Sequence, residues 1–413
     1  MDLICDYIDC TGCMACYNVC PKSAISMCAD KEGFLHPHID ESLCINCKLC
    51  INVCPVKNPV IKHNPIQIYS GWSKNEDIRI ASSSGGAFTE IALYILNHGG
   101  VVFGVILNEK LEAIHSYIEN GTDLEQMRGS KYVQSNINDS FKKAKIFLDQ
   151  GRLVLFSGTP CQIAGLTNYL KKNYANLYTV DLICHGVPSP LIFEEYKQYI
   201  ESKENILIGK IKFRDKKYSW IFFNMQIEGI DRVLKQKKEY IGTYFCDPYL
   251  RGFLRDYFIR PNCHHCVYTT VQRIGDFTIA DWWKYKAKHR LDKGFEEKGV
   301  SLVFCNTNKA VDIFKHLNMF FEERTINEAI TTNKPLSSAF PPSPYRRNFW
   351  EDHEGMRFED LIRKYMYPQS VPLYQRISSS KVHKNINAAL IGILKFAYRV
   401  NCKIKKYCKQ YVN

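Results

Sequence analysis

The sequence predicts an α+β fold in three parts: a small cysteine-rich module, a mixed α/β domain and a helical basic tail. Cysteines are concentrated near the start, since ten of the eighteen fall within the first 54 residues. Beyond residue 66, apolar segments of strand length alternate with helical segments, as in sheets that are covered by helices. Residues 361–413 hold eleven Lys or Arg and no acid, which accounts for all but two of the thirteen net positive charges. These changes set the expected parts at residues 1–61, 67–345 and 346–413.

Two copies of one cysteine pattern dominate the first part. Each reads C-x2-C-x2-C-x3-C-P, the spacing of bacterial ferredoxins that carry two 4Fe–4S clusters. In that pattern three closely spaced thiolates hold one cluster, and the fourth, beside the proline, reaches the other cluster. Zinc also uses C-x2-C pairs, but it needs neither the third cysteine nor the exchanged fourth one. One cluster is therefore expected at Cys10, Cys13, Cys16 and Cys54 (cluster site I), and the other at Cys44, Cys47, Cys50 and Cys20 (cluster site II).

The cellular location follows from the same cysteines. Clusters of this kind need reduced thiolates, so we expect a reducing cytoplasm. The start, Met1–Asp6, shows neither the basic nor the apolar region of a signal peptide. No stretch approaches the roughly 20 apolar residues of a membrane-spanning helix.

Two strand–loop–helix units follow one another in the middle of the chain. Leu153–Ser157 has the pattern of a strand with Cys161 shortly after it, and Leu177–Ile183 has the pattern of a strand followed by Cys184. Successive units of this kind usually pair as a parallel sheet, in which the loops after the strands meet at one edge. The two cysteines should therefore lie close together.

A third cluster is one interpretation of the remaining paired cysteines. Cys161 and Cys184, with the C-x2-C pair Cys263 and Cys266, would supply four thiolates for a third 4Fe–4S site. Zinc at these cysteines, or with one of the two histidines between the last pair, is the main alternative. The other interpretation is two buried cysteines and an unrelated pair, so spacing alone leaves the site open.

Small residues precede the helix expected at Ala87–His98. Ser82–Gly86 reads SSSGG, and hydroxyls with free backbone N–H groups at a helix start suit a phosphate, although an ordinary helix cap is simpler. Arg128–Tyr132 places two cations beside a tyrosine, and a positive charge near a flavin ring stabilises its reduced anion. Gly275–Trp283 ends a strand with an acid and two indoles that could pack on a cofactor or in the core. No nucleotide-binding G-x-G-x-x-G or Walker lysine motif occurs.

Together these stretches resemble the coenzyme F420 hydrogenase/dehydrogenase beta-subunit family. GTPCQ at residues 158–162 followed by CHG at residues 184–186 is quite specific to that family. The matches run in the family's order over about residues 1–285 and become weaker to about residue 345. One departure is Ala280, where a glycine usually precedes the aspartate. The matching segments are the double ferredoxin motif, Ser83–Phe88, Arg128–Ser135, Gly158–Leu166, Asp181–Pro190, Cys263-x2-Cys266 and Gly275–Trp283.

The resemblance implies an FAD in the middle part and a further 4Fe–4S cluster beside it, held by the four cysteines of the third site. Lys131, near the flavin ring or the substrate, is the expected catalytic residue. Family members pass electrons between a two-electron donor or acceptor and one-electron carriers, and some use the deazaflavin coenzyme F420. Forms with fused ferredoxin modules are common near genes for surface polysaccharide synthesis. The expected cofactor contacts are Ser83, Ser84, Gly85, Gly86, Arg128, Lys131 and Thr159.

The favoured function is therefore a flavin-dependent iron–sulfur oxidoreductase that exchanges electrons between FAD and 4Fe–4S clusters. Its electrons would come from a redox partner protein or from reduced deazaflavin, and its acceptor would be an unknown small molecule such as a glycan precursor. The alternative is an electron-transfer module without a substrate of its own, which needs no flavin.

The last part has the pattern of a basic amphipathic helix. From Ile386 to Tyr411, apolar residues recur at alternating steps of four and three, with cations on the other face. Such a helix lies on an anionic membrane surface or docks on an acidic partner, whereas an ordinary terminal helix packs on the body of its protein. We expect peripheral contact with the inner membrane surface. Because the first 360 residues carry a net charge of only +2, we expect no nucleic-acid partner.

Overall fold

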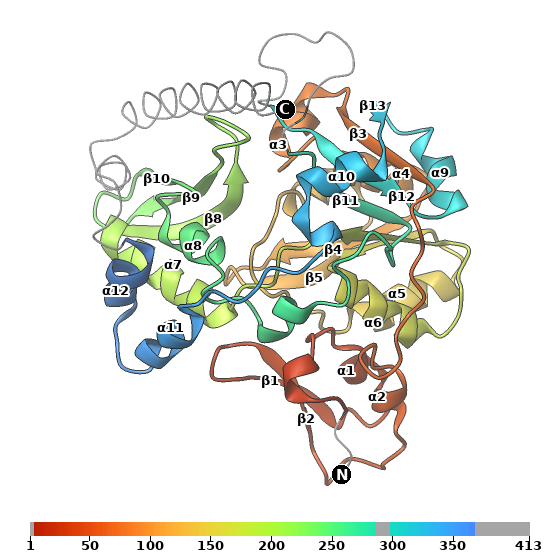
Figure 1. Ribbon diagram of the computed structural model, residues 1–413, viewed down its shortest axis with the longest axis horizontal. Helices are drawn as coiled ribbons and strands as arrows, with labels where there is room; N and C mark the ends of the chain where they lie inside the picture. Colours follow the sequence, from red (N-terminus) through yellow and green to blue (C-terminus); the bar gives the residue numbers. More distant parts are fainter. Residues whose placement is uncertain (1–3, 284, 286–297, 368–413) are drawn as a thin grey trace, which may run out of the picture.

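The computed structural model describes residues 4–283, 285 and 298–367 (Figure 1). Within these ranges a central eight-stranded sheet has the order β13-β3-β12-β11-β7-β6-β4-β5, and a three-stranded sheet has the order β10-β9-β8. A two-stranded hairpin, β1-β2, belongs to the N-terminal module, which lies below the central sheet in Figure 1. The predicted α+β fold, a small cysteine-rich module followed by a mixed α/β domain, is confirmed.

The strands are β1 (Ile25–Ala29), β2 (Leu35–Ile39), β3 (Gln67–Ser73), β4 (Val101–Leu107), β5 (Ala113–Ile118), β6 (Val154–Gly158), β7 (Leu177–Leu182), β8 (Ile206–Asp215), β9 (Asn224–Asp231), β10 (Lys237–Thr243), β11 (Phe277–Asp281), β12 (Ser301–Cys305) and β13 (Met319–Glu323). The α-helices are α1 (Ala15–Val19), α2 (Leu49–Asn52), α3 (Glu76–Ala81), α4 (Ala87–Asn97), α5 (Ser140–Asp149), α6 (Pro160–Leu170), α7 (Pro190–Glu204), α8 (Pro248–Phe253), α9 (Asn308–Phe314), α10 (Ile326–Thr332), α11 (Arg346–His353) and α12 (Phe358–Leu361).

Parallel strands form the middle of the central sheet. β4 pairs with β6, β6 with β7 and β7 with β11, all in parallel, whereas the outer pairs are antiparallel. Parallel strands are buried on both faces and therefore have continuous apolar sequences, which is why β6 could be located from sequence. The loops after β6 and β7 consequently open at the same edge of the sheet, as predicted.

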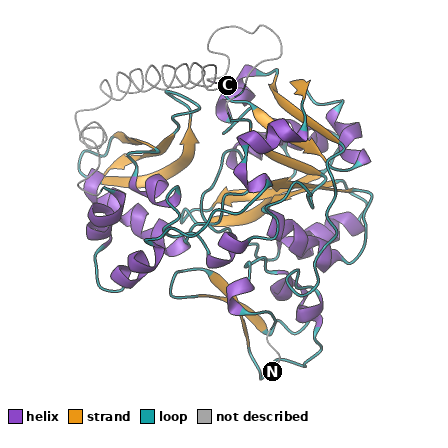
Figure 2. Cartoon of the chain, viewed as in Figure 1, coloured by secondary structure: helices purple, strands orange, loops and turns teal. Residues whose placement is uncertain are grey.

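Helices cover the two faces of this sheet (Figure 2). Leu155 of β6 packs in one core cluster with residues of α4 and α9. Its neighbours Val154 and Phe156 point the other way, into a cluster with residues of α5 and α6. This alternation is the two-residue period of a strand, and it places the start of α4 and the start of α6 on opposite faces of the same sheet.

The N-terminal module packs against α5 and α6. Met14 and Ala15, at the start of α1, and Val53, just after α2, are buried in the same core cluster as Phe141 of α5 and Ile163 of α6. The module is therefore joined to the body by a shared hydrophobic core and not by a linker alone.

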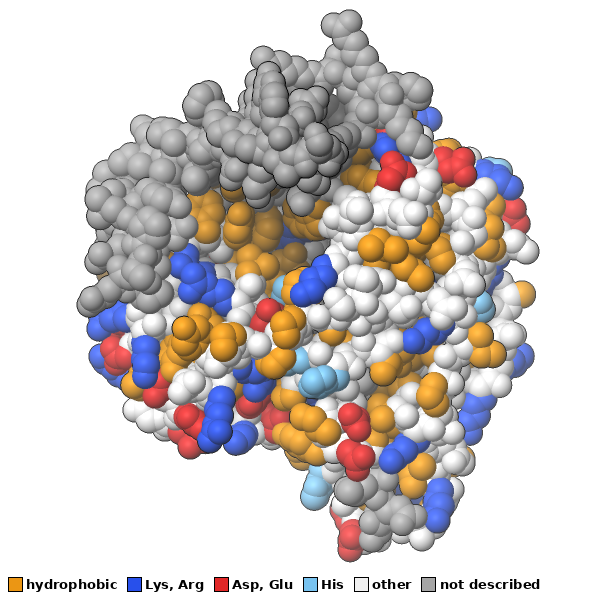
Figure 3. All heavy atoms as spheres, in the orientation of Figure 1, with side chains coloured by type: hydrophobic (Ala, Val, Ile, Leu, Met, Phe, Trp, Pro, Cys, Tyr) orange, Lys and Arg blue, Asp and Glu red, His pale blue; other side chains and the backbone are white. Residues whose placement is uncertain are grey.

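The beginning of the predicted tail is packed as core. Phe349 and Trp350 of α11, Leu361 of α12 and Met366 are buried in the cluster that includes α7, α8 and the three-stranded sheet. The boundary drawn at residue 346 stays a prediction, and the helix predicted from residue 386 lies outside the described residues. On the face shown in Figure 3, acidic and basic side chains are interspersed over the described part. Among the described residues no helix is both long enough and apolar enough to cross a membrane.

Candidate redox sites and cofactor cavity

The two cysteine motifs fold into loops with the same backbone turns. Gly12 and Asn46 occupy equivalent positions in the two motifs, and their φ angles are 67° and 51°. Met14 and Lys48 are likewise equivalent, with φ angles of 61° and 59°. Left-handed conformations are costly for residues other than glycine. Their repetition at matching positions indicates that the two loops have the same backbone conformation because they serve the same function.

Two cavities lie between these loops. One is bordered by Cys20, Cys44, Cys47 and Cys50, which are the four cysteines of cluster site II. The other is bordered by Cys10, Cys13, Cys16 and Cys54, the four cysteines of cluster site I, and also by Cys5. This grouping is the one that the exchanged fourth ligand requires, and ligation itself stays a prediction.

Backbone N–H groups already face some of these sulfurs. The amide of Ala24 donates to Cys20 Sγ at 3.3 Å, and the amide of Asn46 donates to Cys44 Sγ at 3.4 Å. Hydrogen bonds to the sulfurs are one of the means by which a protein sets the potential of a cluster.

Cys5 is a fifth cysteine in the cavity of cluster site I that the spacing did not reveal. Hydrogen bonds to Cys10 and Cys54, together with burial, raise the pKa of the Cys5 thiol. The same contacts lower the pKa of Cys10 and Cys54. A cysteine outside any repeated pattern gives no sequence signal, so the structure was needed to place it.

The four cysteines of the third site come from three segments of the chain. Cys161 is in the first turn of α6, Cys184 follows β7, and Cys263 and Cys266 lie in and beside the 3-10 helix η3 (Pro261–His265). Burial raises the pKa of the Cys184 thiol, and its neighbours Cys263, Cys161 and Cys266 raise it further. The structure therefore brings together the four thiols that the sequence grouped.

The spacing of these thiols can be compared with what metals need. Among the described residues, no three His, Cys, Asp or Glu side chains are close enough to hold a single metal ion. In a 4Fe–4S cubane each thiolate binds a different iron atom, so the thiolates stand farther apart than around one zinc ion. Burial raises the pKa of Cys161 to about 11, so binding to a metal would require that this thiol release its proton.

Cluster site I and the third site are neighbours. A Cβ atom added to Gly165, on α6, would lie 3.0 Å from both Cβ and Sγ of Cys13. The buried phenol of Tyr268 has a raised pKa, first because of burial and then because of Cys161, Cys13 and Cys266. Tyr268 therefore lies between the two cysteine groups, in a core cluster that includes Cys13 and against which Cys161 and Cys266 pack.

A cavity of about 1280 Å³, counting its opening to solvent, lies beside the third site. Its lining includes Cys161, and it also includes Thr11 and Gly12 from the first ferredoxin loop. Every predicted cofactor contact except Gly85 borders the cavity: Ser83, Ser84, Gly86, Arg128, Lys131 and Thr159.

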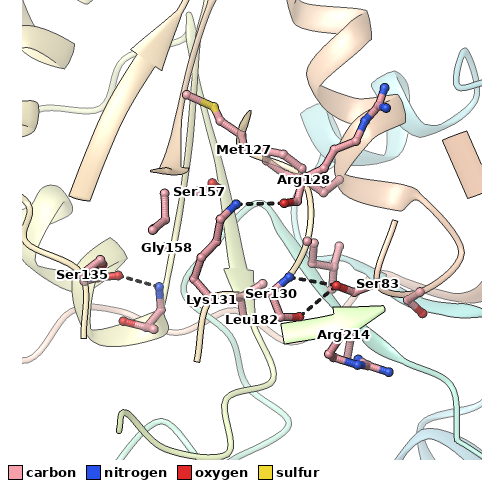
Figure 4. A pocket seen from close by; sticks show the side chains of 18 of the residues that line it. Ser83, Met127, Arg128, Ser130, Lys131, Ser135, Ser157, Gly158, Leu182 and Arg214 are labelled. Carbon is pink, nitrogen blue, oxygen red and sulfur yellow. Dashed lines mark hydrogen bonds between the residues drawn. The ribbon is translucent and has the colours of Figure 1, made fainter. Parts of the chain in front are cut away.

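The serine and glycine segment before α4 forms one wall of the cavity. Ser83 Oγ accepts hydrogen bonds from the amide and the hydroxyl of Ser130, at 2.8 and 3.1 Å (Figure 4). Gly86, with a φ of 98°, is the N-cap of α4, so the first-turn amides of that helix begin at the cavity. Gly85 lies behind the wall, where an added Cβ would meet Gly71 O at 2.4 Å.

Two cations approach the cavity from the loop after β5. The Lys131 ammonium donates to Gln126 O at 3.0 Å and to Arg128 O at 2.9 Å, and its side chain lies between Gly158 and Arg128 in Figure 4. Burial lowers the pKa of Lys131 to about 7. Arg128 is paired with Glu125 at 3.2 Å through Nη1, whereas its buried Nε has no hydrogen-bond partner among the described residues.

Ser135 and Gln162 are polar residues of the cavity that were missed from sequence. Ser135 Oγ lies 3.2 Å from His115 Nδ1 and accepts from Gln162 Nε2 at 3.0 Å. Burial lowers the pKa of His115 to about 4, and its Nε2 can donate to Ser157 O at 3.1 Å, so Nδ1 of the neutral ring can accept a hydrogen bond from the Ser135 hydroxyl. Thr159 serves as the N-cap of α6 in a capping box with Gln162.

The indoles of Trp282 and Trp283 do not border the cavity. Trp282 is buried in a core cluster, and the Trp283 ring stacks on Trp220 with centroids 5.3 Å apart. Of the two roles that the sequence left open for this pair, the core role is the one that the structure shows. Ala280 and Asp281, just before them, do line the cavity.

Comparison with known proteins assigns three segments of the chain to known domain families. Residues 68–142 match the N-terminal model, and residues 151–328 the C-terminal model, of the coenzyme F420 hydrogenase/dehydrogenase beta subunit. Residues 9–58 match the 4Fe-4S dicluster domain. No curated protein matches the sequence. A chain in a solved structure of the F420-reducing (NiFe) hydrogenase complex from Methanosarcina barkeri, from a xenon derivatization study, is 15% identical with a TM-score of 0.40, covering 69% of this chain and 100% of that chain.

The two models of one family thus cover most of the chain between residues 68 and 328, directly after a dicluster iron–sulfur domain. Family models and cysteine cavities agree on an iron–sulfur protein that transfers electrons. This protein therefore belongs to the coenzyme F420 hydrogenase/dehydrogenase beta-subunit family, a family of oxidoreductase type, and it carries a 4Fe–4S dicluster domain at its N-terminal end.

Proposed function

We propose that this protein is an FAD- and 4Fe–4S-dependent oxidoreductase whose cavity binds FAD and whose three cysteine groups each hold one 4Fe–4S cluster. The observation that carries the proposal is the lining of the cavity. Cys161 of the third site and Thr11 and Gly12 of the first ferredoxin loop border the same space as the predicted cofactor contacts. Electrons pass between redox centres only over short distances, so this arrangement suits a relay between a flavin and clusters.

The cavity fits the anionic part of FAD. Its pyrophosphate needs donors and positive charge, which the first-turn amides of α4 and the guanidinium of Arg128 can supply. Arg128 Nε is buried and lacks a partner among the described residues, as a donor reserved for a bound group would be. Bound FAD would supply the conversion between two-electron and one-electron transfer.

Lys131 and Ser135 would act on the reacting end of the cavity. With a pKa lowered to about 7 by burial, Lys131 can hold or release a proton near neutral pH, which suits the catalytic role proposed for it. Ser135, oriented by His115 and Gln162, offers a hydroxyl oxygen of fixed direction to a bound ligand. Ser135 would bind and orient the ligand. Lys131 Nζ would take up or release a proton.

The partners of this reaction are proposed on the family resemblance. Electrons would enter from a redox partner protein or from reduced coenzyme F420. They would leave to an unknown small-molecule acceptor, for which a glycan precursor of surface polysaccharide synthesis is our suggestion. The proposed place of action is the cytoplasm, with contact at the inner membrane surface through the basic tail.

Cofactor analysis of the anaerobically purified full-length protein tests the proposal. We expect about one FAD per chain, and bleaching of flavin and cluster absorbance when a donor is added. Reduced F420 and a reduced ferredoxin, tried separately, distinguish the two donors. Clusters without flavin in protein that was supplied with FAD would overturn the flavin proposal and favour an electron-transfer module without its own substrate.

A further inference from the structure

Arg260 is a buried cation at the junction of the ferredoxin module and the body. The residue is 1% exposed and precedes η3, which carries Cys263. Its Nε donates to Cys10 O at 2.9 Å, and its Nη2 donates to Leu35 O at 3.2 Å and contacts His36 Nε2 at 2.9 Å. One side chain thus holds the loop of cluster site I and the hairpin of the module against the loop of the third site.

Among the described residues, the acids near this cation are paired with other groups. The acids nearest in the hairpin have other partners, since Asp30 pairs with His36 at 3.3 Å and Glu32 pairs with Arg346. Within residues 4–283, 285 and 298–367, Arg260 forms no ion pair, and its buried Nη1 has no hydrogen-bond partner. Burying an unpaired charge is strongly unfavourable, so this position calls for an anionic group.

The cysteines around Arg260 belong to two different groups. On the side of cluster site I, a Cβ atom added to Gly12 would lie 3.0 Å from Arg260 Nη1. On the side of the third site, the amide of Cys263 donates to Arg260 O at 2.9 Å, and the amide of Arg260 donates to Val187 O at 2.9 Å, in the loop that contains Cys184. Consistent with this position, Arg260 opposes the rise in pKa that burial causes at Cys161 and Cys263.

We propose that Arg260 is a positioning residue whose permanent charge, shared between cluster site I and the third site, raises the reduction potentials of both clusters together. The inference rests on the proposed function, because it needs a cluster at each site. A 4Fe–4S cubane held by four thiolates carries net negative charge, and reduction adds one more electron. A nearby cation therefore stabilises the reduced form more than the oxidised form. Cluster site II, whose cysteines border the other cavity of the module, does not share this charge.

Raising both potentials in parallel has a functional consequence. Two adjacent clusters exchange electrons readily in both directions when their potentials are similar. A cation placed at only one of them would make that cluster a trap. The position of Arg260 against Cys10 on one side and near Cys161 and Cys263 on the other affects both partners of the exchange.

The test is a potentiometric titration of the anaerobic full-length protein, followed by electron paramagnetic resonance. In Arg260→Gln we expect the reduced-to-oxidised ratio at a fixed potential to fall about tenfold for cluster I and for the third cluster, which is about 59 mV for a one-electron couple. Cluster II should not change. Asn262→Ala is the matched control, because it removes the 2.9 Å hydrogen bond of Asn262 to Asp9 O, a neutral contact from the same loop to the same module.

Arg260→His is the second variant, because it replaces the permanent charge by a titratable one. We expect the potentials of cluster I and the third cluster to fall more steeply with rising pH in this variant than in the wild type, where His36 is the titratable group that faces Arg260. Three results would overturn the inference. They are unchanged reduction potentials in Arg260→Gln, an equal shift in the potentials of all three clusters in that variant, and an equal shift in Asn262→Ala. If Arg260→Gln does not retain three clusters, the steeper pH dependence in Arg260→His decides, and its absence overturns the inference. A wild-type protein without a third cluster would instead contradict the proposed function.

Discussion

Cys20 and Cys54 connect the two cysteine motifs at the scale of single residues. Cys16 within α1 borders the cavity of cluster site I, whereas Cys20, directly after α1, borders the cavity of cluster site II. Cys50 within α2 and Cys54 just after it show the same relation in reverse. Each short helix thus carries one cysteine toward each of the two cavities, so each cavity is lined by cysteines of both motifs.

Replacing Cys20 by Ser should remove the cluster of site II and leave that of site I, because the missing thiolate faces Cys44, Cys47 and Cys50. Electron paramagnetic resonance of the reduced protein measures this, with Cys28→Ser, an exposed cysteine outside the motifs, as the control. Loss of the cluster of site I alone would show that the ligands are not exchanged.

Residues with a local pattern were predictable, and residues placed by long-range contacts were not. The cluster cysteines follow a spacing that can be read within 20 residues. By contrast, Arg260 meets Cys10 across 250 positions, and Gln134 accepts from the Leu35 amide across 99. Such contacts depend on how separate segments pack, and no property of an isolated arginine or glutamine indicates them.

At the scale of elements, the strand–loop–helix units after β6 and β7 were predictable because buried parallel strands are continuous apolar runs. Their parallel pairing brings Cys161 and Cys184 to one edge of the sheet. The close approach of α6 to the ferredoxin module was not predictable. It depends on Gly165, whose missing side chain leaves room for Cys13.

Gly165→Ala should destabilise the protein, although Gly→Ala inside a helix normally stabilises by about 1 kcal/mol. The added Cβ would lie 3.0 Å from Cys13 Sγ, and such crowding typically costs about 1–3 kcal/mol. Chemical denaturation measures the free energy of unfolding. Thr167→Ala, at an exposed position of the same helix, is the control and should be neutral or stabilising. If Gly165→Ala is more stable than the wild type, α6 does not pack closely against Cys13 of the ferredoxin module.

The corner between the start of α4 and the segment Arg128–Gly129 should bind the phosphates of FAD. Gly129→Asp places a carboxylate there, since an added Cβ would find only Ser83 Oγ, at 3.9 Å. We expect most of the bound flavin to be lost, because like charges repel, while the iron content stays unchanged. Flavin per chain after gel filtration is the measurement.

Gly151→Asp is a closely matched control. Gly151 has a φ of 78°, close to the 81° of Gly129, and an added Cβ there would meet nothing within 4 Å. The two variants therefore share backbone strain and charge and differ in their distance from the cavity lining. Equal flavin content in both variants would show that the phosphates bind elsewhere.

At the scale of the whole molecule, the net charge is concentrated toward the C-terminal end, in residues 361–413. If this segment attaches the protein to an anionic surface, full-length protein should float with anionic vesicles at low salt and be released as salt rises. Each cation near the surface would add about 1 kcal/mol. A version of the protein that ends at Ser380 should not float with the vesicles. Equal behaviour of the two versions at low salt would contradict the attachment.

At the scale of the whole molecule, the cysteine groups also lie close to the cavity, since Thr11 and Gly12 of the first ferredoxin loop and Cys161 of the third site line it together. The iron content of two full-length proteins tests this arrangement most directly. We predict about twelve iron atoms per chain in the wild type, as three cubanes require, and about eight in Cys161→Ser. About eight iron atoms in the wild type with one zinc, or an unchanged iron content in Cys161→Ser, would contradict the account.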